Sequence, residues 1–357
     1  MAFTDIDKPS DYMRIQTWSG NNSADREITW SESDNMQPNW IWVKRRSDSA
    51  NHRIADSVRG ATKILRSDTN GAETTESDDT LSFDTNGFSV GNNSGVNKTG
   101  DTYVGWGWAA GTSFSNDQSS TGVGSIDSAG SVNTDAGFSI IGFTGDAQTG
   151  TTIAHGLGVK PDMIILKNRE PDTANWQVYH KSLGATHYVQ LNTNGQATDS
   201  NTRWNDVEPT SSVFTTGSSG DVCGDSSGET FIAYCFAEKK GYSKFGSYKG
   251  NNNADGTFIF TGFKPAFVMV KLTDTQTDGW VIQDNKRDIS NTGTSTRLRA
   301  NTGGAEFTST NEIDFLSNGF KPRGDDGEIN GNGSKHIYMA FAENPFVTST
   351  GVPTTAK

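Results

Sequence analysis

Cysteine, histidine and basic residues are scarce in this chain, and each shortage excludes a class of protein. Only 2 Cys and 5 His occur in 357 residues, which is too few for a disulfide scaffold or a four-thiolate zinc site. The 30 Lys and Arg residues are outnumbered by 42 Asp and Glu, leaving a net charge of −12. Affinity for nucleic-acid phosphates comes from clustered basic side chains, so we expect no nucleic-acid partner.

Long apolar runs are missing as well. No run approaches the ~18 apolar residues that a membrane-spanning helix needs, and residues 1–12 carry acids where a secretory signal would carry an apolar core. We therefore expect no membrane association. Glycine, in contrast, is in excess at 40 residues of 357, above the usual ~7%. Together with abundant Ser, Thr and Asn, this composition is typical of an all-β, loop-rich extracellular or virion protein.

Four sequence landmarks recur in the same order three times, which indicates a triplicated unit. The first is a Pro followed by an apolar run and a Lys, at 38–44, 161–167 and 265–271. The second reads NHRIADSVRG, NWQVYHKSLG and GWVIQDNKRD, at 51–60, 175–184 and 279–288. The third is a short strand pattern running into a turn, at 63–72, 187–196 and 296–305. The fourth is a closing strand pattern, at 100–111, 228–241 and 333–344.

These landmarks divide the chain into three domain-sized units with flanking segments. The predicted segments are an N-terminal arm (1–11), a first unit (12–111), a Gly/Ser/Asn linker (112–137), a second unit (138–241), a third unit (242–346) and a C-terminal tail (347–357).

The local pattern within each unit predicts strands. The apolar runs at 41–43 and 163–166 are typical of strands buried on both faces. Asn-Gly pairs supply the positive-φ residues of tight hairpin turns, and they occur at 70–71, 86–87, 194–195 and 318–319. We predict an all-β fold of three tandem β-sandwich, jelly-roll-like repeats, each of about 100 residues and each burying a core of its own.

Aromatic residues are the natural candidates for these cores. The tryptophans that we assign to core packing are Trp40, Trp42, Trp106, Trp108, Trp176, Trp204 and Trp280. The alternative is that some of them form sugar-stacking platforms. Those inside the repeated landmarks fit packing better, because Met, Phe or Ile replaces them in the other units.

No constellation of reactive side chains emerges. Residues 224–228 resemble a serine-protease nucleophile loop, but a glycine-rich hairpin loop explains them better. His180 aligns with Asp56 and Asp284, a combination that favours a hydrogen-bonded turn over a metal ligand. Asp56–Arg59 and Asp284–Arg287 repeat at i, i+3, which predicts surface ion pairs across a turn, each worth ~0–1 kcal/mol.

We accordingly assign no catalytic, cofactor-binding or metal-ligating residues, and we expect a protein that is not an enzyme. A glycan-degrading enzyme stays open as a minor alternative, because glycosidase carboxylates can lie far apart in sequence. Loops 250–256 and 323–328 offer oxygen ligands that suit Ca²⁺, although plain Asx-rich turns explain them as well. Cys223 and Cys235 are expected to be free thiols.

The landmarks resemble a β-rich domain that recurs in structural proteins of tailed bacteriophages, especially marine ones, which are often described as tail-fibre-like or adhesin-like. The matching segments are 3–12, 37–46, 57–63, 83–91, 154–169, 176–185, 230–248, 261–271 and 337–346. The resemblance implies a virion component assembled in the host cytoplasm, and it carries no catalytic residues.

Two roles follow from the resemblance. The first is a tail-associated fibre or receptor-binding protein for host adhesion, which would contact a tail adaptor and a cell-surface glycan or protein, and would form a homo-oligomer such as a trimer. The second is a decoration, cement or head-fibre protein on the capsid. The sequence shows none of the long coiled or β-helical shaft usual in fibres, which weakens the first role.

Overall fold

The computed structural model describes residues 3–170, 173–223, 227–275, 278–287, 291, 295–310 and 313–354. Within these residues the chain is almost entirely β-strand, and each α-helix has only four residues. The predicted all-β sandwich class is confirmed. No helix in this part of the chain has the length and apolarity needed to span a membrane.

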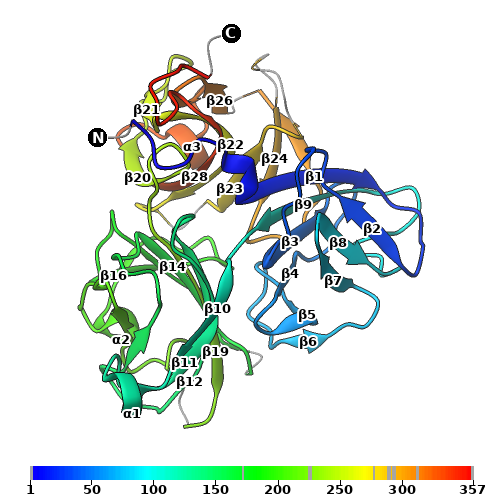
Figure 1. Ribbon diagram of the computed structural model, residues 1–357. Helices are drawn as coiled ribbons and strands as arrows, with labels where there is room; N and C mark the ends of the chain where they lie inside the picture. The colour runs from blue at the N-terminus through cyan, green and yellow to red at the C-terminus, as the bar shows by residue number, and fades with distance from the viewer. Residues whose placement is uncertain are drawn as a thin grey trace.

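Three large antiparallel sheets share one strand order and form the three lobes of the molecule (Figure 1). The first runs β1 (Met13–Ser19), β9 (Thr102–Trp108), β3 (Trp40–Arg45), β4 (Arg53–Asp56), β5 (Gly60–Leu65), β6 (Thr74–Thr75). The third runs β20 (Ser243–Lys249), β28 (Lys335–Pro345), β22 (Phe263–Leu272), β23 (Trp280–Asp284), β24 (Ser295–Arg299), β25 (Phe307–Ser309).

The second large sheet has the same order with two further strands at its edge. It runs β10 (Thr112–Asn116), β11 (Ser128–Asn133), β12 (Phe138–Thr144), β19 (Thr230–Phe236), β14 (Met163–Asn168), β15 (Gln177–His180), β16 (His187–Gln190), β17 (Thr198–Asp199). We call the parts of the chain that form these sheets unit I (β1 to β9), unit II (β10 to β19) and unit III (β20 to β28).

A small sheet packs against one face of each large sheet and encloses an apolar core between them. The small sheets are β2 (Arg26–Thr29), β8 (Gly87–Val90) and β7 (Thr80–Asp84) in unit I; β13 (Thr152–Ala154) and β18 (Val213–Thr215) in unit II; and β21 (Ile259–Phe260), β27 (Gly319–Pro322) and β26 (Ile313–Leu316) in unit III. Each unit is therefore a two-layer sandwich.

The opposite faces of the three large sheets meet in one shared core at the centre of the molecule. Three equivalent cross-strand pairs line it: Trp40 beside Trp108, Met163 beside Phe236, and Phe267 beside Phe341. The rings pack across units, since Trp40 stacks on Tyr234 with centroids 4.7 Å apart and Trp108 meets Phe341 edge-on at 5.6 Å. Burying a large apolar side chain contributes roughly 1.5–3 kcal/mol, so this centre is a major source of stability.

The shared core corrects the expectation that each unit buries all of its tryptophans in its own core. All seven are buried, as predicted, but only Trp204 lies in the core of a single unit. The other six lie in the shared core: Trp40, Trp42, Trp106, Trp108, Trp176 and Trp280.

The predicted linker 112–137 is also wrong, because most of it is ordered sheet. It forms β10, helix α1 (Gln118–Thr121) and β11, and β11 pairs along its whole length with β12. Gly130 is required there, since a Cβ atom at this position would lie 1.8 Å from the carbonyl oxygen of Ile140.

The described parts of the predicted arm and tail, residues 3–11 and 347–354, both lie on the body of the protein. Thr4 donates a hydrogen bond to the carbonyl oxygen of Lys240, Ile6 enters the shared core, and residues Pro9–Asp11 form the short 3₁₀ helix η1. Near the other end, Ser349 bonds Asp7, so the two ends of the described chain lie together beside unit III (Figure 1).

Candidate functional site

The repeated polar residues meet at the junctions between units. Lys44, Lys167 and Lys271, the lysines of the first landmark, are fully buried. Each amine donates to a carbonyl oxygen of a turn in the neighbouring unit: Lys44 to Gly303 at 3.2 Å, Lys167 to Asn70 at 3.3 Å and Lys271 to Asn194 at 3.2 Å. Unit I thus reaches unit III, unit II reaches unit I and unit III reaches unit II, which closes a ring.

The aspartates of the second landmark join these junctions as buried hydrogen-bond acceptors. Asp56 accepts the Arg59 guanidinium at 2.5 Å and the hydroxyl of Tyr234 in unit II at 2.7 Å. Asp284 accepts Arg287 at 2.6 Å and the indole N–H of Trp106 in unit I at 2.9 Å. Both ion pairs bridge a turn, as predicted, but they are fully buried and not on the surface.

Each of these pairs extends into a chain of charges that crosses its junction. Glu73 binds Arg59 at 3.0 Å and accepts two bonds of 2.9 Å from Arg169 of unit II. Glu306 binds Arg287 at 3.1 Å, and Arg46 of unit I donates two bonds of 2.9 Å to it. Fork-shaped Arg–carboxylate contacts fix orientation as well as attraction.

His180 occupies the aligned position at the junction between units II and III. Its Nδ1 accepts the backbone N–H of Ser182 at 3.1 Å, and its Nε2 donates to the carbonyl oxygen of Tyr338 at 3.1 Å. The predicted hydrogen-bonded turn is confirmed. Burial lowers the pKa of His180 to about 4, so the ring is neutral at physiological pH.

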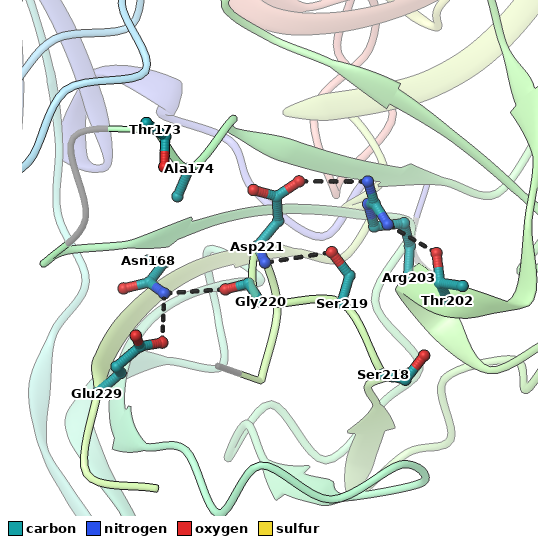
Figure 2. A pocket seen from close by; sticks show the side chains of 10 residues that line it. All are labelled: Asn168, Thr173, Ala174, Thr202, Arg203, Ser218, Ser219, Gly220, Asp221 and Glu229. Atoms are coloured by element: carbon teal, nitrogen blue, oxygen red, sulfur yellow. Dashed lines mark hydrogen bonds and ion pairs between the residues drawn. The ribbon is translucent and has the colours of Figure 1, made fainter. Parts of the chain in front are cut away.

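A polar cavity of about 380 Å³ opens beside the second large sheet, and we take it as the candidate binding site (Figure 2). Its walls come from the end of β14, from helix α2 (Asn201–Trp204) and from the loop before β19. The lining residues are Asn168, Thr173, Ala174, Thr202, Arg203, Ser218, Ser219, Gly220, Asp221 and Glu229.

Two hydrogen-bonded pairs hold its polar side chains in place (Figure 2). On one side, the buried Asn168 amide donates to Gly220 O and to Glu229 Oε2, both at 2.9 Å. On the other, Arg203 lies 3.2 Å from Asp221 and stacks over the Tyr188 ring at 4.7 Å. The site presents an amide, a guanidinium, two carboxylates and several hydroxyls, a mixture that suits a hydroxylated ligand such as a sugar.

The sequence did not single out this cavity. In unit I the residue aligned with Asn168 is Arg45, which forms an ion pair with Asp101 at 2.9 Å. In unit II the residue aligned with Asp101 is Glu229, which keeps the carboxylate but pairs it with the neutral amide of Asn168. That exchange is the one signal in the aligned repeats that could have drawn attention to this position.

The remaining sequence candidates do not converge. His52, His155, His180 and His336 are buried separately, and burial lowers the pKa of His52 to about 3 and that of His155 to about 4. Cys223 and Cys235 are free and buried, as expected. Gly224–Ser226 of the protease-like loop lies outside the described residues.

In the two loops considered for Ca²⁺, side-chain oxygens accept hydrogen bonds from other groups of the protein. Asn251 Oδ1 accepts from Asn253 N at 3.1 Å, and Glu328 accepts from Arg297 at 2.6 Å and from Arg299 at 2.7 Å. Asp326 caps helix α3 (Gly327–Asn330). In the part of the chain that the structure describes, no group of three or more His, Cys, Asp or Glu could hold a metal ion.

Comparison with known proteins gives a family without an assigned activity. A family model described as a domain of unknown function (DUF7483) matches residues 8–345. The matched range runs from near η1 to the end of β28, so one family unit takes in all three large sheets together. No curated protein and no solved structure matches the chain.

Proposed function

We propose that this chain, which belongs to the DUF7483 family of domains of unknown function, is a structural protein of the virion of a tailed bacteriophage. Within the virion it serves as a host-adhesion module at the tail. The resemblance of its landmarks to tail-fibre-like and adhesin-like proteins supports the virion role, and the polar cavity of unit II supports adhesion.

The observation that carries the proposal is the closure of three sandwiches around one aromatic core. Buried lysines cross all three interfaces. Chains of Asp, Arg and Glu cross two of them, and at the third, beside His180, uncharged side chains occupy the aligned positions. Such interlocked packing makes a rigid carrier that presents surface sites at fixed positions. This suits a particle component that must keep its shape outside the cell.

Location and copy number on the particle test the virion role. Electron microscopy of labelled particles, with quantitative gels of purified virions, should find tens of copies at the tail. Hundreds of copies on the head would favour the capsid-decoration alternative. Absence of the protein from purified virions would refute both.

Binding of the purified chain to intact host cells tests adhesion. Ser218→Trp would place a large ring in the cavity and should abolish cell binding, whereas Ser211→Trp on an exposed loop of the same unit should leave it unchanged. Equal binding by both variants would exclude this cavity. Release of sugar from envelope material by the wild-type chain, lost in Glu229→Gln, would instead establish the enzymatic alternative.

A further inference from the structure

The three junctions between units share one backbone scaffold. The N–H of Glu73 donates to the carbonyl oxygen of Arg169 at 2.7 Å, that of Glu306 to Arg46 at 2.8 Å, and that of Ala197 to Thr273 at 2.9 Å. Because this main-chain contact recurs at all three junctions, the side chains that each junction places beside it can be compared position by position.

At two junctions that space holds a charged quartet, and at the third it does not. The quartets are Asp56, Arg59, Glu73 and Arg169, and Asp284, Arg287, Glu306 and Arg46. The aligned residues between units II and III are His180, Leu183, Ala197 and Thr273.

The residue facing the aspartate changes with them. Tyr234 and Trp106 donate to Asp56 and Asp284, but the aligned residue of unit III is Met339, which has no such donor. Loss of one member of a buried ion pair is strongly destabilising, because an unpaired charge is left behind. The concerted exchange avoids this and leaves the four aligned positions of the third junction uncharged, and we call it the neutral junction for this reason.

The missing side chains leave room. A cavity of about 340 Å³ lies at this junction and is lined by Leu183, His187, Gln196, Ala197, Thr273, Asp274 and Lys335. Three of the lining residues, Leu183, Ala197 and Thr273, occupy the positions that are Arg, Glu and Arg at the charged junctions. The volume falls at the lower end of the range for small-molecule sites, which is ~300–1,000 Å³.

The lining of the cavity combines apolar and polar side chains. Leu183 and Ala197 provide the apolar part. The Lys335 ammonium gives one of its three N–H donors to the carbonyl oxygen of Ser182 at 2.7 Å, which leaves two for a ligand. Gln196 adds an amide to the lining, while the Asp274 carboxylate accepts the backbone N–H of Lys335 at 2.6 Å and can also accept from a hydroxyl.

We infer that this neutral junction is a binding site for an acidic sugar residue. The ring lies against Leu183 and Ala197, its carboxylate binds Lys335, and its hydroxyls bond Gln196 and Asp274. The site is distinct from the cavity of Figure 2. Its role in recognising a host glycan rests on the proposed function, but the binding itself does not.

Titration of the full-length chain with glucuronate, galacturonate and N-acetylneuraminate, followed by saturation-transfer NMR and calorimetry, tests the inference. At least one acidic sugar should bind, and the matching neutral hexose should bind roughly tenfold more weakly for lack of the charge-assisted bond. Lys335→Gln should reduce acidic-sugar binding to the level of the neutral hexose.

The decisive variant restores the pair found at the other junctions. Ala197→Glu with Thr273→Arg should refill the cavity and abolish binding while the thermal midpoint is kept or raised, which shows that the fold is intact. Ser211→Trp, at an exposed position that lines neither cavity, should leave acidic-sugar binding unchanged. Sugar binding by a chain that is absent from virions would uphold this site and refute the proposed function.

Three results would overturn the inference. They are the absence of binding by all three acidic sugars, unchanged binding in the folded Ala197→Glu/Thr273→Arg variant, and equal affinity for acetate, which would mean that only an ion is bound.

Discussion

Lys44 and Lys271 are fully buried cations whose amines bond to backbone carbonyl oxygens. Burial lowers the pKa of both to about 8 from an ordinary value of 10.5. At a pH between these two pKa values the lysines of the unfolded chain bind more protons than those of the folded chain, so stability should rise with pH.

We therefore predict that the free energy of unfolding increases from pH 8 to pH 10, by on the order of 1 kcal/mol per lysine. Urea unfolding at both pH values measures this. The Lys44→Met/Lys271→Met variant should be less stable at pH 8 and should lose the rise with pH. An equal rise in the variant would assign the effect to other groups.

His180 supports a second prediction at the residue scale. His180→Asp would place a buried carboxylate opposite Met339, with Leu183 where the other units have arginine. An unpaired buried charge costs several kcal/mol, and we expect a loss of about 3 kcal/mol in urea unfolding. His180→Asp/Leu183→Arg should recover part of this loss.

Ser211→Asp, at an exposed position of the same unit, is the control and should change stability by less than about 0.5 kcal/mol. A tolerated His180→Asp would mean that water reaches this position.

At the scale of elements, the junction between units I and II allows the contribution of the charged chain to stability to be measured apart from that of the packing around it. Glu73→Ala removes the carboxylate that binds both Arg59 and Arg169, and Arg59 is fully buried. We predict a loss of about 3–5 kcal/mol, the range for breaking a buried pair.

Replacing the whole quartet with the residues of the neutral junction should cost less than the single change. The variant is Asp56→His, Arg59→Leu, Glu73→Ala and Arg169→Thr, and equilibrium unfolding in urea gives the comparison. A quadruple variant less stable than Glu73→Ala would show that the charged chain stabilises this junction beyond balancing its own charges.

The sequence predicts some of these elements well. The apolar runs of β3 and β14 identify strands buried on both faces, because no polar residue interrupts them. Asn86-Gly87 and Asn318-Gly319 mark the turns of the β7–β8 and β26–β27 hairpins. The expectation that such pairs supply positive-φ residues is confirmed only at Gly87, where φ is 142°, and is wrong for Asn318-Gly319.

Other features depend on partners distant in the chain, and local pattern does not reveal them. Strands β10 and β11 are rich in Ser, Gly and Asn because they lie at the edge of a sheet, and only partly buried residues such as Phe114 and Val132 reach the core. The sequence predicts Asp56 to be a surface residue, whereas in the structure it is buried and accepts a hydrogen bond from the hydroxyl of Tyr234 in another unit. Both candidate cavities likewise arise from residues that are ordinary in sequence.

For the whole molecule, the shared core implies that the three units unfold together. Trp108 of unit I contacts Phe267 and Phe341 of unit III, while Trp40 contacts Phe138, Tyr234 and Phe236 of unit II. An isolated unit would expose these rings to water, losing the burial that stabilises a small domain.

We predict one cooperative urea transition, with coincident curves from tryptophan fluorescence, far-UV circular dichroism and amide exchange in β3, β14 and β22. Trp108→Ala should shift all three signals together by about 3–5 kcal/mol, the usual cost of removing a buried tryptophan, although the change lies in unit I alone. A fragment of residues 112–241 should lack the near-UV signal of packed aromatics. Aromatic rings that stabilise one cooperative structure cannot be exposed to water without loss of the fold. If that fragment folds, or if the transitions separate, the units are therefore independent domains and the shared core is only an interface between them.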